Sequence, residues 1–222
     1  QNHLEEMVAS QVAEMTRMQD EVITGIANLI ESRDGSTGLH VKNTQNYVQI
    51  LTKALREKGM YPDILDHNYE LNTVKASVLH DIGKIKTPDA ILLKPGRLTD
   101  EEFEVMKQHT VAGCEIIDRI IGNVEHEEYV DIARKIARYH HERWDGTGYP
   151  DGLSGEEIPL CARIMALADV FDALYQDRCY KKAIRPASKV FEIIKENSGS
   201  QFDPNLTEIF LELQREITDI SE

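Results

Sequence analysis

One segment, from Ile158 to Tyr175, limits the possible folds more than any other part of the chain. Its run LCARIMALADVFDALY is apolar almost all the way round a helix, and a helix without a polar face must be covered by other elements on every side. A chain of 222 residues is long enough to provide that cover, as one large domain or two small ones. The sequence therefore predicts a central, buried helix.

Apolar residues recur at helical spacing along most of the remaining chain, and no segment alternates convincingly as a strand would. Pro186 and Pro204 each suit the first turn of a further helix, with Asp203 as the cap of the last one. Thr99 and Glu102 form a capping-box sequence. We expect an all-α domain of about eight helices. The other expected segments are His40–Lys58, Glu70–Ile82, Thr99–Gln108 with a continuation or restart over Ala112–Ile121, and Val124–Glu142.

Residues 1–30 form a long amphipathic pattern with a narrow apolar stripe. A stripe this narrow is typical of a two-stranded coiled coil or of a helix that packs on a partner. From Val22 the pattern is more broadly apolar, which is typical of a helix laid on its own domain, and both arrangements can hold in different halves. We expect a linker helix over 1–30 that mediates a homodimer, and one domain over 31–222. The stripe consists of Leu4, Val8, Val12, Met15, Met18, Val22, Ile26 and Leu29.

The chain is acidic, with 39 Asp and Glu against 25 Lys and Arg and a formal net charge of -14. Such a charge repels nucleic acids and anionic membranes from most of the surface, so an anionic ligand needs a local site. No segment can enter hydrocarbon without burying charge. Cys114, Cys161 and Cys179 are odd in number and lack CxxC spacing, which favours neither a disulfide framework nor a zinc-thiolate site. We therefore expect a reducing cytoplasm as the location. We also expect a piece of a longer protein, because the chain starts at Gln1 with neither an initiator Met nor a signal peptide.

The main chemical signal is a set of histidines at predicted helix ends, together with nearby aspartates. Adjacent His-Asp and His-His pairs are poor helix formers, so their presence there indicates a ligand. Asp169 lies in the predicted buried helix, where a carboxylate needs a cation or a hydrogen-bond partner, and a salt bridge to Arg163 is the alternative explanation. The set comprises His40, His80, Asp81, His109, His140, His141 and Asp169, with Asp172 facing nearly the same side as Asp169.

Imidazole and carboxylate ligands without thiolates suit iron, manganese, zinc or another first-row divalent ion. The set is too large for one tetrahedral site, and two metals that share a carboxylate would account for it. Two-metal sites typically hydrolyse phosphate esters by activating a bridging water. A long irregular loop, RWDGTGYPDGLSGEE over 143–157, lies between two helices that carry candidate ligands, and loops of this length usually have a function or are mobile.

Three linked motifs make the sequence similar to a known family. They are HDIGKIKTPDAILLKPGRLT from His80, HHERWDGTGYPDGLSGEEIP from His140 and DVFDALYQDRCYKKA from Asp169. The chain resembles, over about Ile30 to Leu213, the HD-GYP domain, a branch of the HD metal-dependent phosphohydrolases whose members hydrolyse cyclic di-GMP in bacteria. The resemblance implies an HD-domain helical bundle, extended by GYP-specific C-terminal helices and preceded by a long N-terminal helix, at the output end of a response regulator or membrane sensor.

The resemblance implies two metal sites that share Asp81. Iron and manganese are the expected metals, with zinc, nickel, cobalt or magnesium as alternatives. Some family members bind a third metal through a Glu four residues before the first ligand histidine, where this chain has Ser36. A hydroxyl cannot replace an anionic carboxylate, so we expect a dinuclear site, with Asp172 as an outlying ligand at most. His40, His80, Asp81 and Asp169 would hold one metal, and Asp81, His109, His140 and His141 the other.

The resemblance also implies substrate contacts. Lys84, one turn after the His-Asp pair, would bind a phosphate and neutralise transition-state charge, with a salt bridge to Asp81 as the alternative. Arg178 and Lys181, in a locally basic segment, would contact phosphate or guanine. Tyr149 of the GYP triplet would stack on or hydrogen-bond the substrate.

The expected activity is hydrolysis of cyclic di-GMP to linear pGpG, and on to GMP if the linear product rebinds. Asp81 and Lys84 are the expected catalytic residues, acting with a metal-activated water. A second hypothesis is a receptor or interaction module that binds the cyclic dinucleotide without hydrolysis. A third is the same chemistry on another cyclic dinucleotide, such as cyclic GMP-AMP. An upstream sensory or receiver domain is the expected source of the input signal.

Overall fold

The computed structural model describes residues 2–34, 39–122, 127–176 and 183–220. Within these ranges the chain forms helices and no strand, apart from one isolated bridge between Ser198 and Phe202, which confirms the all-α prediction. The α-helices are α1 (Asn2–Glu31), α2 (His40–Glu57), α3 (His67–Ala76), α4 (Asp89–Leu92), α5 (Asp100–Ile121), α6 (Glu127–Tyr139), α7 (Leu160–Tyr175), α8 (Ala187–Glu196), α9 (Pro204–Glu212) and α10 (Gln214–Asp219). The short 3-10 helices are η1 (Ser32–Asp34), η2 (Ser77–Leu79), η3 (Ile82–Lys86) and η4 (Gly155–Glu157).

Several helix ends follow from local sequence signals. Thr99 caps α5 through a capping box with Glu102, and the helix then runs without a break to its end. Asp203 accepts a hydrogen bond from the Asn205 N–H and caps α9, with Pro204 in its first turn. The short helices α4 and α10 are additional to the predicted set, because a helix of one or two turns leaves no periodic pattern to detect.

The predicted helix over Glu70–Ile82 is wrong at its C-terminal end. Instead, α3 ends at Ala76, and the chain tightens into η2 and η3, with His80 and Asp81 between them. Apolar spacing continues through this stretch, and 3-10 turns keep a similar face at a tighter pitch. Periodicity alone therefore did not separate the two conformations.

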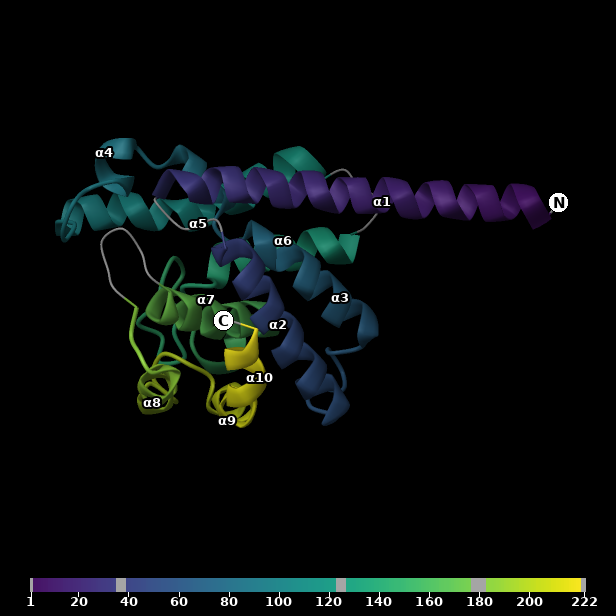
Figure 1. The fold of residues 1–222 in the computed structure, drawn as a ribbon. Coiled ribbons are helices and arrows are strands. Elements are labelled where there is room, and N and C mark those ends of the chain that lie inside the picture. Colours follow the sequence, from purple (N-terminus) through teal and green to yellow (C-terminus); the bar gives the residue numbers. More distant parts are fainter. Residues whose placement is uncertain (1, 35–38, 123–126, 177–182, 221–222) are drawn as a thin grey trace.

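The central helix is α7, as predicted. Almost every residue in it is buried, and it packs against α2 and α6 and also against α8 and α9 (Figure 1). The Phe171 ring contacts the rings of Tyr47 on α2 and Phe210 on α9. Because neighbours surround it, α7 holds Asp169 and Asp172 at fixed positions in the interior.

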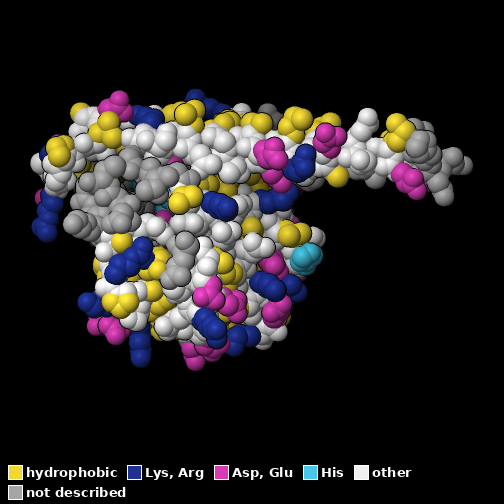
Figure 2. Space-filling model, viewed as in Figure 1, with side chains coloured by type: hydrophobic (Ala, Val, Ile, Leu, Met, Phe, Trp, Pro, Cys, Tyr) yellow, Lys and Arg dark blue, Asp and Glu magenta, His cyan; other side chains and the backbone are white. Residues whose placement is uncertain are grey.

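The two halves of α1 have different surroundings. The N-terminal half extends beyond the rest of the molecule, whereas the C-terminal half lies along it (Figure 1). Ala27 and Ile30 are buried, while Met15 and Met18 are 60% and 59% exposed. Figure 2 shows hydrophobic side chains at intervals along the helix. The second half is thus laid on its own domain, as the broader apolar pattern from Val22 predicts.

No helix in the described part of the chain combines the length and the apolar character needed to cross a bilayer. Cys114 and Cys161 are free, and Cys179 lies outside the described residues. Burial raises the pKa of the Cys161 thiol to about 11, so this thiol is unreactive at neutral pH.

Candidate metal centre

Asp81 is the centre of a buried cluster of imidazoles. It follows His80 in the tight turn between η2 and η3. Its Oδ2 lies 3.3 Å from His80 Nε2, and its Oδ1 lies 3.3 Å from His109 Nε2 and 3.7 Å from His140 Nε2. His109 belongs to α5 and His140 follows α6, so three separate parts of the chain converge on one carboxylate.

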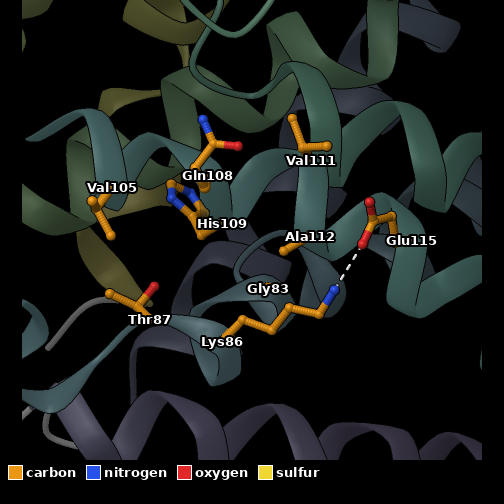
Figure 3. A pocket seen from close by; sticks show the side chains of 9 residues that line it. All are labelled: Gly83, Lys86, Thr87, Val105, Gln108, His109, Val111, Ala112 and Glu115. Atoms are coloured by element: carbon orange, nitrogen blue, oxygen red, sulfur yellow. Dashed lines mark hydrogen bonds and ion pairs between the residues drawn. The ribbon is translucent and has the colours of Figure 1, made fainter.

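A close contact between η3 and α5 brings Asp81 to His109. Gly83 lies so near α5 that a Cβ atom there would be 1.8 Å from the His109 carbonyl oxygen, which no side chain can tolerate. Only glycine permits this approach, and the 3-10 turns in place of the predicted helix accommodate it. A cavity of about 230 Å³ lies beside this contact. Figure 3 shows the residues that line it, among them Lys86 and Glu115, which form an ion pair at 2.7 Å.

Hydrogen bonds at Nδ1 orient three of the imidazoles. In His80, His109 and His140, Nδ1 lies 2.9, 2.7 and 2.9 Å from a main-chain carbonyl oxygen three or four residues earlier. A carbonyl oxygen can only accept, so the proton of each neutral ring is on Nδ1 and the lone pair is on Nε2. Histidines that bind metals are commonly held in this way.

His40, the first residue of α2, is oriented by a carboxylate instead. Its Nδ1 donates to Asp172 Oδ2 at 2.7 Å, while Asn43 and Tyr47 donate to Asp172 Oδ1 at 3.1 and 3.4 Å. The other ring nitrogen, His40 Nε2, lies 3.4 Å from Asp169 Oδ1. Asp172 therefore lies behind the His40 ring, and Asp169 lies in front of it.

The atoms that face the middle of this cluster are those that a metal would bind. Nε2 of His40, His80, His109 and His140 and Oδ1 of Asp81 are buried without a hydrogen-bond partner among the described residues, and each such atom costs about 1–3 kcal/mol. Two ligand atoms about 2.1 Å from one cation and about 90–110° apart are separated by about 3.0–3.4 Å. Most of the N···O distances above fall in that range, so the donor set fits divalent metal ions.

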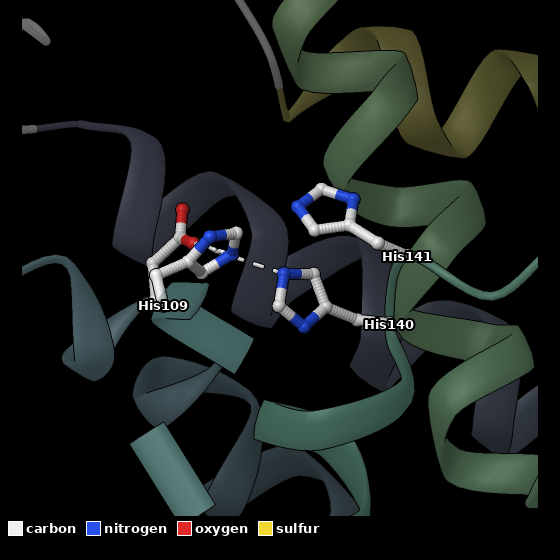
Figure 4. A group of neighbouring side chains, drawn as sticks. His109, His140 and His141 are labelled. Atoms are coloured by element: carbon white, nitrogen blue, oxygen red, sulfur yellow. Dashed lines mark ion pairs between the residues drawn. The ribbon is translucent and has the colours of Figure 1, made fainter. Parts of the chain in front are cut away.

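The candidate ligands form two groups that share Asp81. In each group, one ligand atom from every residue lies within 4.8 Å of the others. Figure 4 shows the rings of His109, His140 and His141 turned toward one another. All the ligands predicted from the sequence are thus brought together, with Asp169 beside His40. The first group consists of Glu31, His40, His80 and Asp81, and the second group of Asp81, His109, His140 and His141.

Neighbouring charges shift the histidine pKa values in opposite directions. Burial lowers the pKa of His80, but Asp81, Asp169 and Glu31 outweigh burial and raise it to about 9. At His109 burial prevails over the attraction of Asp81 and lowers the pKa to about 4. The first group is therefore the more anionic environment.

Lys84 is the cation nearest to Asp81 in the described site. Its Nζ lies 2.6 Å from Asp81 Oδ2 and 3.7 Å from Glu31 Oε1. Burial raises the pKa of Asp81, but Lys84 and His80 outweigh burial and hold this pKa well below its usual range. The salt bridge considered as the alternative role of Lys84 is therefore present. It also places the ammonium beside any phosphate that reaches Asp81.

The loop over 143–157, called the GYP loop after its GYP triplet, is built around Glu142. Its buried carboxylate accepts main-chain N–H bonds from residues 151–153 at 2.7, 3.1 and 3.1 Å. A Cβ atom at Gly148 would be 2.4 Å from a main-chain nitrogen of the preceding turn, so the loop closes tightly only with glycine there. The Tyr149 N–H donates to the His141 carbonyl oxygen, and the two ring centroids are 4.9 Å apart. The loop thus holds Tyr149 beside the second group.

A cavity of about 270 Å³ opens beside the second group. His140, His141 and Tyr149 line it together with Phe103 and Lys107 of α5. Lys107 Nζ lies 5.0 Å from the centre of the Phe103 ring and 5.6 Å from that of Tyr149, a favourable arrangement of a cation and aromatic rings. Cation and rings together suit an anionic ligand that carries a flat base.

One sequence-based expectation, a salt bridge between Arg163 and Asp169, is not found within the residues that the structure describes. Arg163 pairs with Asp203 at 2.6 Å, so the alternative explanation that pairs Arg163 with Asp169 is wrong. Both carboxylates are possible partners in sequence terms, and only the packing of α9 against α7 selects Asp203. Outside the described residues lie Ser36, Arg178 and Lys181.

Glu31 and Lys107 are site residues that sequence reasoning missed. Glu31 is the last residue of α1, and no motif distinguishes it from the other glutamates of that helix. Its i, i+4 spacing from Ala27, in the segment from Val22 that is expected to pack on the domain, is the one available signal, because residues four apart share a helix face. The i, i+4 spacing of Phe103 and Lys107 could have indicated a cation beside a ring.

Comparisons with known proteins identify the family of the chain. The sequence matches the HD domain family over residues 4–206. A cyclic di-GMP phosphodiesterase of Vibrio cholerae is 44% identical, covering 94% of this chain and 42% of the relative. A 3'3'-cGAMP-specific phosphodiesterase of the same organism is 35% identical, covering 90% of this chain and 36% of the relative. An HDG"Y"P protein from Bdellovibrio bacteriovorus has a similar fold, with a TM-score of 0.58, 17% identity, and coverage of 90% of this chain and 63% of that chain.

The chain spans about half or less of the length of the curated relatives that it matches. The family match nevertheless extends over nearly all of its residues. An HD domain implies divalent metals, and the two groups around Asp81 are residues able to bind them. The chain therefore belongs to the HD domain family.

Proposed function

We propose that this domain is a metal-dependent phosphodiesterase that hydrolyses cyclic di-GMP to linear pGpG, and on to GMP when the linear product rebinds. The observation that carries the proposal is the pair of ligand groups that share Asp81, with Lys84 2.6 Å from the shared carboxylate. The relative named a cyclic di-GMP phosphodiesterase supports the choice of substrate.

Two divalent cations, iron or manganese, are the proposed cofactors. Imidazole and carboxylate donors without thiolates suit both metals. When bound, the cations would make a water nucleophilic near neutral pH and would neutralise phosphate charge. The proposed ligands are His40, His80, Asp81 and Asp169 for one cation, and Asp81, His109, His140 and His141 for the other.

Side chains of the protein would position the substrate and respond to its charge. Lys84 would bind an oxygen of the attacked phosphate and stabilise the negative charge that develops on it. Asp81 stays ionised beside Lys84, so the proposed bridging ligand carries no proton at neutral pH. Tyr149 and Lys107 would hold a base and a phosphate in the cavity beside the second group.

Further substrate contacts are proposed on the sequence alone. Arg178 and Lys181 follow α7 in a locally basic stretch of an acidic chain. A planar guanidinium suits a phosphate or the edge of guanine. These side chains would draw an anionic dinucleotide to a protein whose net charge otherwise repels it.

Incubation of the metal-loaded protein with cyclic di-GMP, followed by separation of the nucleotides, tests the proposal. We expect pGpG to accumulate, and His80→Ala protein to lose both turnover and bound metal. Lys53→Ala, an exposed change on α2, is the control and should retain both. If the metal-loaded wild-type protein binds the dinucleotide tightly and leaves it intact, the domain is a receptor and the proposal is wrong.

Cyclic GMP-AMP is the second candidate substrate. A relative 35% identical to this chain is named as specific for 3'3'-cGAMP, whereas the relative named for cyclic di-GMP is 44% identical. We therefore expect a higher kcat/KM for cyclic di-GMP when both dinucleotides are offered to the same preparation. The opposite ratio would assign the domain to cyclic GMP-AMP.

We also propose that α1 mediates a homodimer in the cytoplasm and connects the domain to an upstream sensory or receiver domain. The side chains of Val8, Val12, Met15, Met18 and Val22 are each at least half exposed. Two such stripes could pair as a coiled coil and remove apolar surface from water. Glu substitutions at Met15 and Met18 should shift sedimentation toward the monomer, and an unaffected dimer would contradict this interface.

A further inference from the structure

The C-terminal end of α1 reaches the metal centre. Glu31 is the last residue of this helix, and it is only 3% exposed. Its Oε1 lies 3.7 Å from Lys84 Nζ, and it is a member of the first group of ligand atoms. A carboxylate buried in this way stays ionised only where positive charge lies beside it, and the Lys84 ammonium and a bound cation would both supply that charge.

Arg33 fixes the end of α1 against the turn that carries Asp81. Its guanidinium donates to three main-chain carbonyl oxygens in and after η3, at distances of 3.2–3.4 Å. It also pairs with Asp89 at 2.6 Å. These contacts do not involve the Glu31 side chain. The contacts of Arg33, two residues after Glu31, therefore hold the end of α1 beside the metal centre independently of the Glu31 side chain.

Two histidines beside Glu31 have ring nitrogens that could bind the same metal ion. Nε2 of His40 and Nε2 of His80 are buried and have no hydrogen-bond partner among the described residues. Bonds at Nδ1, to Asp172 and to a main-chain carbonyl oxygen, turn both rings in this direction. The ligand atoms of the first group all lie within 4.8 Å of one another. Two ligand atoms on opposite sides of one cation are expected to lie about 4.2 Å apart, so these separations are short enough for a single ion.

We propose that Glu31 is a carboxylate ligand of the cation held by the first group, so that α1 contributes directly to the metal centre. The inference rests on the proposed metal-dependent function. A carboxylate at this position adds negative charge to a site that must hold a divalent cation beside the Lys84 ammonium, and it attaches one ligand to the helix that leaves the domain. Movement of α1 would then change the occupancy of the first site.

Metal binding by the full chain, stripped with a chelator, tests the inference. Calorimetric titration with Mn²⁺ and the Mn²⁺ EPR spectrum report affinity and coordination without a turnover assay. We expect Glu31→Gln to weaken one of the two Mn²⁺ sites by at least about tenfold and to leave the other unchanged. Glu21→Gln, an exposed change on the same helix, should alter neither site.

A second variant separates metal ligation from a charge contact with Lys84. If Glu31 acted only through Lys84, Glu31→Gln would have no effect on Mn²⁺ affinity in a Lys84→Met background, whereas a ligand keeps its effect there. Wild-type affinity at both sites in Glu31→Gln would overturn the inference. A wild-type protein that binds no Mn²⁺ would instead overturn the proposed function.

Folding of each variant is checked by circular dichroism in the presence of the chelator. Should Glu31→Gln fail to fold, Glu31→Asp takes its place, because it keeps the charge and shortens the reach of the carboxylate. We expect Glu31→Asp to weaken the same single site. Unchanged Mn²⁺ affinity in this variant would overturn the inference as well.

Discussion

The two ligand groups that share Asp81 are built in different ways. The first group takes its members from the end of α1, the start of α2 and the turn between η2 and η3, and it has Asp169 and Lys84 beside it. The second group takes its histidines from α5 and from the chain after α6, where main-chain carbonyl oxygens and the GYP loop hold the rings. A charged side chain orients His40 in the first group, although a main-chain carbonyl oxygen orients His80 there. Backbone and packing alone hold the histidines of the second group.

The pKa values of the histidines show the consequence of this difference. Burial alone would lower the pKa of His80, but the carboxylates around it raise this pKa to about 9. At His109 burial prevails and lowers the pKa to about 4. A cation that enters the first group therefore takes the place of a proton on His80, whereas the His109 ring in the second group is already neutral. Loss of charge should damage the first group more, and loss of ring orientation should damage the second.

The largest effect is expected from Asp81→Asn, because this residue belongs to both groups. The amide keeps the shape of the side chain but removes the anionic bridge, so neither cation retains its shared ligand. We expect turnover to fall by at least about a thousandfold and bound metal to fall at both sites, measured by elemental analysis of the same preparation. Retention of both metals would show that the groups do not depend on a common carboxylate.

Paired variants in the separate groups should each remove one metal. His40→Gln changes the first group only, and His109→Gln changes the second group only. We expect the metal content to drop from two ions to one in each variant, with different Mn²⁺ EPR spectra for the ion that remains. Loss of both ions in either variant would mean that the groups act as one cooperative unit.

The second group was easier to recognise from the sequence, because all of its members except His109 lie in the motifs quoted above. His140 and His141 are adjacent, and the glycines and the glutamate that shape the following loop are part of the same run. The central helix that carries Asp169 was also predictable, since its lack of a polar face requires cover on all sides. A structure can be predicted from local sequence patterns where the contacts that determine it join residues close together in the chain.

The first group was less predictable, because contacts distant in sequence determine it. Glu31 has no recognisable motif. It joins the site because α1 packs on the domain through Ala27 and Ile30 and because Arg33 binds the η3 carbonyl oxygens. The 3-10 turns around Asp81 depend on the approach of Gly83 to α5, which periodicity cannot reveal. Likewise, the choice of Asp203 rather than Asp169 by Arg163 depends on helix packing.

Asp172→Asn should give a smaller effect that is confined to the first group. The carboxylate accepts the hydrogen bond from His40 Nδ1 at 2.7 Å, and an amide weakens this charge-assisted bond while preserving its shape. We expect Mn²⁺ affinity at the first site to fall by about 10–100-fold and the second site to be unaffected. Asp131→Asn, an exposed change on α6, is the matched control. Equal losses at both sites would remove the distinction between the groups.

The smallest effect is expected from Lys107→Gln, which tests the substrate side of the second group. Lys107 lies beside the rings of Phe103 and Tyr149 and contacts none of the candidate ligands in the interactions described above. Lys107 is half-buried and also pairs with Glu104 at 2.6 Å. A cation beside aromatic rings contributes about 0.5–1 kcal/mol, so we expect KM for cyclic di-GMP to rise about two- to fivefold with metal content unchanged. Lys135→Gln on α6 removes an exposed charge of the same kind and should leave KM as it is. If Lys107→Gln lowered the metal content instead, Lys107 would support the ligands and not the substrate, and the second group would depend on charge as the first does.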